Sequence, residues 1–344
     1  MQTKEEDVVT TLFVANTHTP LLFFTTDGMV YKLKCWRLPQ GGRTAKGKAI
    51  VNILPITTGV SIAAIMPVDR AEKDWDELQI VFATSAGTVR RNRLSDFTNV
   101  MRNGKIAMKF DDEHSETRLI NARICSDDDD VMLVTALGRA IRFPTTDVRV
   151  FNSRSSVGVR GIRLADGDRV VSMSVIRHFD ASSEERTAYL KQRRLMAGLT
   201  DEEETDDEEE AIAGGQLSPE RYAEMSAAED LILTITTRGT GKLSSSHDYP
   251  VRGRGGQGVQ AIDKRLRGGP LVACFPVEID DQIMLVTSTG QSIRCPVEDI
   301  SFRSRSAGGV RVFNTAKGEE VVSVAWIADQ GDDEGQGTGD PSGD

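Results

Sequence analysis

A β-hairpin pattern that recurs five times along the chain of 344 residues is the feature that most constrains its fold. In each copy an apolar run leads into a glycine-containing turn and a second alternating strand follows, which is typical of a β-hairpin. A second glycine comes 17 to 20 residues after each turn glycine. The turn glycines are Gly28, Gly87, Gly138, Gly239 and Gly290, and the glycines that follow them are Gly47, Gly104, Gly158, Gly258 and Gly309.

The copies are regularly spaced where nothing is inserted. Intervals of 51 residues separate Gly87 from Gly138 and Gly239 from Gly290. A period of roughly 40–50 residues with four strands in each unit is typical of propeller-type β arrays. Because one such sheet cannot bury both of its faces, we expect the units to pack on one another. The sequence therefore predicts an all-β, propeller-like array of about five four-stranded blades within residues 1–328, with units at about 9–68, 78–125, 131–176, 231–277 and 282–328.

An insertion of different composition, residues 181–230, separates the third unit from the fourth. Its first part, Ser183–Ala197, contains good helix formers, and Ser218-Pro219 supplies an N-cap serine and a proline at the first position of a second short helix. The acidic run DEEETDDEEE at 201–210 and the acidic tail at 329–344 are too polar and too charged to fold. We expect the insertion to be partly helical and partly disordered, and the tail to be disordered.

The net charge of −10 becomes informative once it is divided among these parts. The insertion holds 15 acidic and 5 basic residues, and the tail holds 6 acidic and no basic residues. The remaining repeats hold 31 acidic and 37 basic residues, a net charge of +6. The chain thus combines a basic repeat body with two acidic segments.

Several classes of protein are excluded or disfavoured. No apolar run approaches the ~20 residues that span a bilayer, and the polar, acidic start MQTKEEDVV is no signal peptide. The four cysteines lack metal-ligand spacing, which favours reduced thiols in a cytoplasmic protein; they are Cys35, Cys125, Cys274 and Cys295. No phosphate-binding loop of the GxxxxGK[ST] type is present. The sequence predicts no membrane partner, no metal site and no cofactor held by this chain.

Basic residues recur at matching positions around the two glycines of each unit. They stand four residues after the turn glycine, four residues before the second glycine, or one or two residues after it, and the fourth unit departs with Leu243 and Gln260 at two of these positions. Equivalent positions in packed units lie at equivalent radii, so we expect a belt of cations that binds the phosphates of double-stranded DNA. The candidate DNA-binding residues are Lys32, Arg43, Lys46, Lys48, Arg91, Arg102, Lys105, Arg142, Arg154, Arg160, Lys242, Arg252, Arg254, Gly255, Gly256, Gly258, Arg294, Arg303, Arg305 and Arg311.

Two plainer interpretations compete with this one. Any single arginine is more often a solvated surface charge, and the glycines are explained by turn dihedrals alone. The recurrence in register favours the belt, but a protein-interaction propeller whose basic rim docks an acidic partner stays open. We hypothesise that the acidic insertion or the tail is itself such a partner, which contacts the rim within the chain at high effective concentration.

The repeats resemble the C-terminal domain of DNA gyrase A, a β-pinwheel. The similarity lies in LFVANTHTPLLFFTTDGMVYKLKCWRLP, RTAKGKAIVNILP, VGVRGIRLADGDRVVSMSV and DQIMLVTSTGQSIR, and it covers roughly residues 5–328 apart from the insertion. The resemblance implies a domain that wraps DNA, in a cytoplasmic type II topoisomerase that introduces negative supercoils with ATP and Mg²⁺. It implies the remainder of gyrase A and the gyrase B protein as partners in a heterotetramer. The corresponding C-terminal domain of topoisomerase IV, with a more degenerate array, is the alternative.

One family motif is missing from its expected place. The family's first blade carries a Gln-Arg-Arg-Gly-Gly-Lys-Gly heptad, which we expect to lie upstream of Met1, so that the chain holds five blades of six. The most similar stretch is RGRGGQG at Arg252–Gly258, in which Gln257 replaces the lysine. Neither the four tyrosines nor the four histidines stand in a catalytic or ligand-like setting, so we expect this chain by itself to be non-catalytic.

Overall fold

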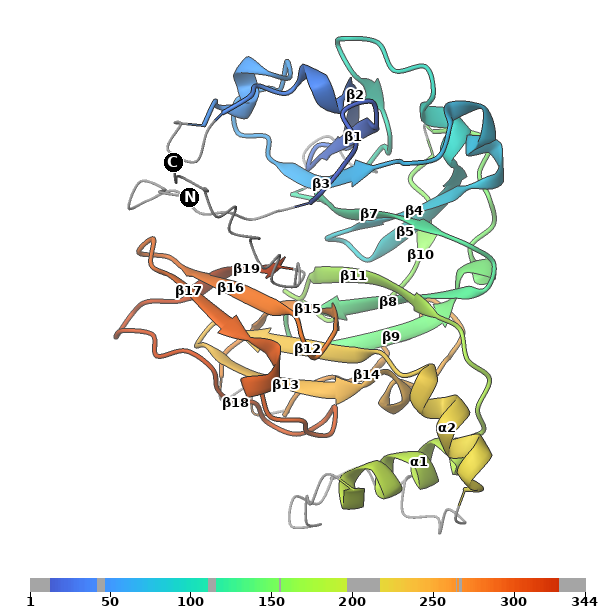
Figure 1. Ribbon diagram of the computed structural model, residues 1–344, viewed down its shortest axis with the longest axis vertical. Helices are drawn as coiled ribbons and strands as arrows, with labels where there is room; N and C mark the ends of the chain where they lie inside the picture. Colours follow the sequence, from blue (N-terminus) through green and yellow to red (C-terminus); the bar gives the residue numbers. More distant parts are fainter. Residues whose placement is uncertain are drawn as a thin grey trace, which may run out of the picture.

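The computed structural model describes residues 13–41, 47–110, 116–154, 156–196, 217–263, 265 and 268–327, and it is built from five antiparallel sheets packed side by side (Figure 1). The all-β, propeller-like fold class is therefore confirmed. Four sheets have four strands, whereas the last has three among the described residues, which corrects the expectation of four in each. The sheet orders are β3-β1-β2-β6, β10-β5-β4-β7, β11-β8-β9-β14, β15-β12-β13-β18 and β17-β16-β19.

The long strands follow the repeat of the sequence. Each repeat supplies a hairpin and a returning strand, which pairs with the first strand of that hairpin. The hairpins are β1 (Pro20–Thr25) and β2 (Met29–Lys34), β4 (Gln79–Thr84) and β5 (Thr88–Arg93), β8 (Asp129–Thr135) and β9 (Arg139–Pro144), β12 (Leu231–Thr236) and β13 (Thr240–Ser245), and β16 (Gln282–Thr287) and β17 (Ser292–Pro296). The returning strands are β3 (Ile62–Pro67), β7 (Leu119–Cys125), β11 (Val170–Arg177), β15 (Leu271–Val277) and β19 (Val321–Ile327).

The fourth strand of each complete sheet comes from the following repeat. These short strands are β6 (Lys105–Ile106), β10 (Val159–Arg160), β14 (Val259–Gln260) and β18 (Val310–Arg311). Each begins directly after a second glycine and pairs with the hairpin of the preceding repeat, as β14 does with β9. Sequence analysis placed all four strands of a blade in one unit, so this exchange corrects it. The exchange links every sheet to the next along the chain.

The second glycines allow this crossing. Gly258 has a φ of +71°, and a Cβ atom there would lie 2.2 Å from the carbonyl oxygen of Ala140. A Cβ on Gly309 would lie 2.8 Å from the amide nitrogen of Gly241. Only glycine lets the incoming backbone approach the preceding sheet this closely.

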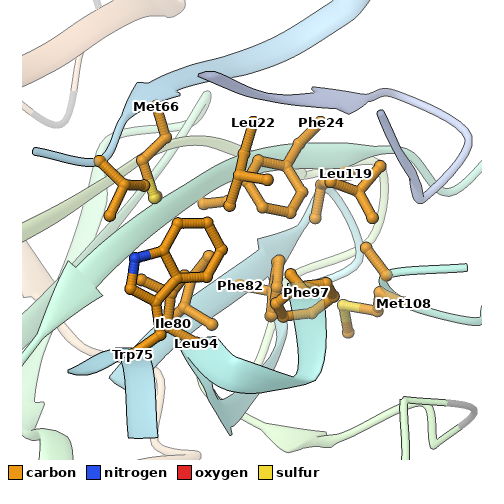
Figure 2. Packing of buried hydrophobic residues seen from close by; sticks show 14 residues of the cluster. Leu22, Phe24, Met66, Trp75, Ile80, Phe82, Leu94, Phe97, Met108 and Leu119 are labelled. Carbon is orange, nitrogen blue, oxygen red and sulfur yellow. The ribbon is translucent and has the colours of Figure 1, made fainter. Parts of the chain in front are cut away.

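The core lies between successive sheets. Between the first two, Phe24, Phe82 and Phe97 form an edge-to-face triad with ring centroids 5.5 to 5.9 Å apart (Figure 2). Trp75 is fully buried beside them and donates its indole N–H to the carbonyl of Arg70 at 3.0 Å. Burial of one such large apolar side chain contributes about 1.5–3 kcal/mol. Both faces of each central sheet are buried against neighbouring sheets in this way, which explains the long apolar runs of the hairpins.

The array has an inner and an outer side. The returning strands contact one another in succession, β3 with β7, β7 with β11, β11 with β15 and β15 with β19. The short exchanged strands lie at the opposite edge of each sheet, on the outside of the array (Figure 1). We call this outer edge, made of β6, β10, β14, β18 and the loops that lead into them, the rim.

The insertion forms a helical hairpin of α1 (Ser183–Met196) and α2 (Pro219–Ala227), outside the sheets (Figure 1). The predicted cap is confirmed, since the Ser218 side chain accepts the Arg221 amide. The hairpin packs on His247 of the fourth repeat, which contacts Tyr189 and whose Nε2 lies 2.8 Å from the carbonyl of Met225. The acidic run at 201–210 and the tail lie outside the described residues. No helix in the described part of the chain is long and apolar enough to cross a membrane.

Candidate nucleic-acid interface

The exposed candidates gather on the rim or next to it. Arg160 and Arg311 stand on the exchanged strands themselves, and Arg252 and Arg254 stand on the loop that leads into β14. Half-buried members are Lys32, Lys105, Arg154 and Arg303, while the exposed ones are Lys48, Arg102, Arg160, Arg252, Arg254, Arg294 and Arg311. Arg43 and Lys46 lie outside the described residues.

Four candidates lie inside the structure instead. Arg91, Arg142, Lys242 and Arg305 are only 6%, 4%, 0% and 6% exposed. Their predicted position on the surface is wrong, because their charged groups are occupied by protein oxygens between adjacent sheets. Apart from Arg305, the buried cations form two sets. One set stands four residues after the turn glycine of its repeat and the other stands three residues after it.

The first set stands four residues after the turn glycine and clamps the next repeat. The Arg91 guanidinium donates to the carbonyl of Val148 at 2.6 Å, and that of Arg142 donates to the carbonyl of Ser246 at 2.9 Å. Each acceptor lies in or beside a 3₁₀ helix of the following repeat, Thr145–Asp147 or Ser246–Asp248. The half-buried Lys32 makes the corresponding contact with Thr98.

Neighbouring carboxylates balance these cations. Arg142 pairs with the fully buried Asp130 at 2.7 Å, Arg91 with Asp127 at 2.6 Å and Lys32 with Glu72 at 2.9 Å. A buried charge that is paired and fully hydrogen-bonded holds its neighbours in one arrangement, because losing either partner is costly. These cations therefore fix the stacking of the sheets.

The second set stands three residues after the turn glycine and holds the loop that leads into the next exchanged strand. The ammonium of Lys242 donates to the carbonyls of Ser304 at 2.8 Å, Ala307 at 2.7 Å and Arg305. Arg90, which sequence analysis missed, donates to the carbonyls of Arg154 at 2.5 Å and Ser156 at 2.7 Å, and to that of Ala107. The sequence did contain a sign of this burial, because the equivalent position in two other repeats holds an isoleucine, Ile141 or Ile293.

Burial changes the acidity of both groups. Desolvation lowers the pKa of Lys242 to about 7 and that of Arg90 to about 10. The neighbouring charges act in opposite senses: Asp248 raises the pKa of Lys242, whereas Arg305 and Arg303 lower it. Carbonyl oxygens supply the acceptors that water would otherwise provide.

Arg305 has a different structural role. Its guanidinium donates to the backbone carbonyls of Asp248 and Gln260, both at 2.8 Å, and its backbone amide donates to the Asp248 carboxylate at 2.7 Å. It thereby ties the loop of the fifth repeat to the fourth.

The stretch Arg252–Gly258 bridges two sheets at the rim. The Arg254 guanidinium donates to the carbonyls of Asp147 at 2.9 Å and Arg160 at 3.1 Å. The amide of Gly255, whose φ is +86°, donates to the carbonyl of Gly161 at 2.6 Å. The structure thus brings Arg160, Arg252 and Arg254 onto one continuous part of the rim, with Gly256 exposed beside them.

A shallow hollow of about 350 Å³ lies further along the rim, lined by Ile106, Asn152, Ser153 and Arg154. Lys105, next to it, donates to the carbonyl of Asp96 at 2.9 Å. Burial, and then the positive charge of Arg154, lower the pKa of Lys105. Two cations in close proximity beside a hollow suit an anion such as a phosphate.

Within the described ranges, no group of three or more His, Cys, Asp or Glu residues is arranged to hold a metal ion. All four cysteines are free, and Cys125 and Cys274 are buried.

Known proteins match this chain in segments that correspond to its five repeats. A family model described as DNA gyrase C-terminal domain, beta-propeller, matches residues 19–69, 79–116, 129–177, 230–278 and 281–325. The chain is 46% identical to the DNA gyrase A protein of Granulibacter bethesdensis, over 95% of this chain and 36% of that protein. It is 41% identical to the DNA gyrase A protein of Rickettsia bellii, over 96% of this chain and 36% of that protein. The chain thus spans about a third of the length of these relatives.

Solved structures share the fold. The C-terminal domain of DNA topoisomerase IV superposes with a TM-score of 0.68 at 19% identity, covering 91% of this chain and 80% of that chain. The DNA gyrase A C-terminal domain superposes with a TM-score of 0.63 at 20% identity, covering 93% of this chain and 89% of that chain.

Proposed function

The chain belongs to the DNA gyrase C-terminal domain family, and from this premise we propose that its rim binds duplex DNA through the phosphate backbone and wraps it. The observation that carries the proposal is the succession of exposed cations on the exchanged strands and their loops, at Arg160, Arg252, Arg254 and Arg311. Their spacing around the outside of the array gives a curved, positively charged track.

Wrapping requires energy from many small contacts. Smooth bending of a 20–30 base-pair site costs on the order of 1–6 kcal/mol. Serial contacts from lysine, arginine and backbone amides to phosphates offset this cost without reading sequence. The rim offers such groups on successive sheets, and the buried cations keep the sheets in a fixed relation.

The sheet exchange supports this role. Each rim strand belongs to one repeat and pairs with the sheet of the preceding repeat. A force on DNA bound at the rim is therefore transmitted to two sheets. A bent duplex tends to straighten and so pulls its bound ends away from the rim, and a rim built in this way shares that load between sheets.

The wider setting follows from the relatives rather than from this chain. We propose that the chain acts as the DNA-wrapping part of a cytoplasmic, ATP-hydrolysing type II topoisomerase, with the gyrase B protein and the rest of gyrase A as its partners. In that assembly ATP and Mg²⁺ bind elsewhere and this chain itself is non-catalytic. The overall identity to DNA gyrase A proteins favours gyrase over topoisomerase IV.

The test is to ligate nicked circular DNA with this chain bound and to measure the linking number after deproteinisation. We expect a shift of one sign that increases with protein and disappears at high salt, because log K falls by about 0.9 per phosphate contact per unit of log salt. The double variant Arg160→Gln/Arg252→Gln should reduce the shift. The matched control is Arg118→Gln/Arg169→Gln, which removes the same charge from exposed positions before the inner strands β7 and β11. An unchanged linking number with the unsubstituted chain would refute wrapping.

A further inference from the structure

The loop at Ser304–Gly308, which leads into β18, carries a feature that the belt of side chains does not include. We propose that the backbone amides of Ser306 and Gly308 form a seat for a DNA phosphate, and that the buried Lys242 is the positioning residue that orients them. This inference rests on the proposed function and names a contact through which the rim achieves it.

Peptide geometry gives the orientation. In a trans peptide the C=O bond and the following N–H bond point in opposite directions. Lys242 holds the carbonyls of Arg305 and Ala307, and these peptides carry the N–H groups of Ser306 and Gly308. Both N–H groups therefore point away from the Lys242 ammonium, which is itself 0% exposed.

These two amides have no protein acceptor in the part of the chain that the structure describes. By contrast, the neighbouring amides of Arg305 and Ala307 donate to the Asp248 carboxylate and to the carbonyl of Ser304. Gly308 is exposed and Ser306 is half-buried, so a ligand oxygen can approach them from outside. Successive amides that converge on one side of a loop bind anions.

The charge beneath the loop has the right sign. Arg305 is paired with Asp248, with 3.4 Å between Nε and Oδ1, whereas the ammonium of Lys242 contacts three carbonyls. After the ion pair is counted, the protonated Lys242 leaves one positive charge beneath the loop, and this charge is lost as the pH rises above the Lys242 pKa of about 7. It attracts an anion at the outer side through a low-dielectric layer.

The second repeat shows that an arginine can perform the same task. Arg90 occupies the position equivalent to Lys242, is 0% exposed, and holds the carbonyls of Arg154 and Ser156 in the equivalent loop. The peptide of Ser156 then directs the amide of Val157 away from Arg90. This equivalence provides a conservative substitution for the test.

The experiment follows the amide resonances of Ser306 and Gly308 by NMR while a duplex too short to bend around the rim is added to the full chain. We expect both resonances to shift and saturate with the unsubstituted chain. Lys242→Met should abolish the two shifts and weaken binding of the short duplex about three- to tenfold, as expected for the loss of charge-assisted hydrogen bonds. Lys242→Arg should retain them, as Arg90 does in the second repeat.

The outcomes separate the inference from the function. If the duplex binds the unsubstituted chain but neither amide shifts, the seat is wrong; if both shift equally in Lys242→Met, Lys242 does not orient them. In either case the rim function stands. If no duplex binds the unsubstituted chain, the function itself fails. Inorganic phosphate alone should shift the amides only at much higher concentration than the duplex does; the reverse order would overturn the assignment to nucleic acid. Should Lys242→Met fail to fold, the amide shifts in the unsubstituted chain and in Lys242→Arg still decide the matter.

Discussion

Two neighbouring rim loops, at 252–258 and 303–309, each lie over a strand that carries one cation and one aliphatic residue side by side. The order of the cation and the aliphatic residue is reversed between the two strands. Beneath Arg252–Gly258 the hairpin strand places Ile141 and then Arg142, whereas beneath the loop at 303–309 it places Lys242 and then Leu243. The cation and the aliphatic residue have changed places. Successive side chains of a strand point to opposite faces, so a shift by one residue sends the cation to a different neighbour.

The consequence is a different way of holding each loop. Arg142 clamps the 3₁₀ helix of the next repeat, and its loop is held by Arg254 and by glycine backbone contacts. Lys242 holds its loop directly by three carbonyls. The second repeat has cations at both positions, Arg90 and Arg91, and uses both contacts. A cation four residues after the turn glycine therefore clamps adjacent sheets, and one three residues after it shapes the rim loop. A repeat can have either cation or both.

The largest effect is expected at the clamp. Arg142→Met should lower the free energy of unfolding by about 3–5 kcal/mol, because the fully buried Asp130 loses the guanidinium and keeps only the His178 imidazole, at 2.8 Å, as a basic partner. Urea unfolding of the two chains measures the difference. The double variant Arg142→Met/Asp130→Asn should recover part of the loss. A single-variant loss below about 1 kcal/mol, the range of exposed pairs, would mean that the ion pair contributes little.

A smaller but still large effect is expected where the loop Arg252–Gly258, which we call the box-like loop because it is similar to the family's heptad, joins the preceding sheet. Gly258→Ala should cost about 2–4 kcal/mol, because its Cβ would lie 2.2 Å from the carbonyl oxygen of Ala140 at a φ of +71°. The matched control is Gly253→Ala in the same loop, where nothing lies within 4 Å of the added atom. Thermal unfolding of the two variants compares them. Equal melting temperatures would show that β14 can move away without loss.

Local patterns in the sequence predicted what is local in the structure. The turn glycines, the hairpins and the Ser218 cap follow from short-range chemistry, and all are present. The exchanged strands could not be predicted, because two residues carry no hydrophobic period and their pairing is with another repeat.

The candidate site divides in the same way. Recurrence in register identified Arg160, Arg254 and Arg311, which are exposed on the rim, but it equally selected Arg91 and Arg142, which are buried. A cation inside a strand is buried or exposed according to which carbonyls of a distant loop face it. That information depends on the packing of the next repeat and not on the local sequence.

A third prediction concerns the cation of the second loop. The folded-state pKa of Lys242 is about 7, below its ordinary value of 10.5, so between these values the unfolded chain binds more protons than the folded chain. The free energy of unfolding of the unsubstituted chain should therefore rise relative to that of Lys242→Met as the pH increases from 7 towards 10. Below pH 7 both states are protonated and the difference should be constant. Urea unfolding across this range measures it, and a flat difference throughout would mean that the pKa of Lys242 is not lowered.

The smallest effect on stability, and the one that bears on binding, is expected from the two exposed arginines of the box-like loop. Arg252→Gln should change the free energy of unfolding by less than about 0.5 kcal/mol, as exposed surface substitutions do, and should reduce the slope of log K against log salt by about one for a lost phosphate contact. Arg254→Gln should also weaken DNA binding but cost somewhat more stability, because its guanidinium donates to the carbonyls of Asp147 and Arg160. Binding to a linear duplex at several salt concentrations, beside urea unfolding, measures both quantities for each variant. If Arg252→Gln left the salt slope unchanged while Arg254→Gln lowered it, the cation that also shapes the loop would be the one that contacts phosphate, and the separation between shaping and binding would fail at this loop.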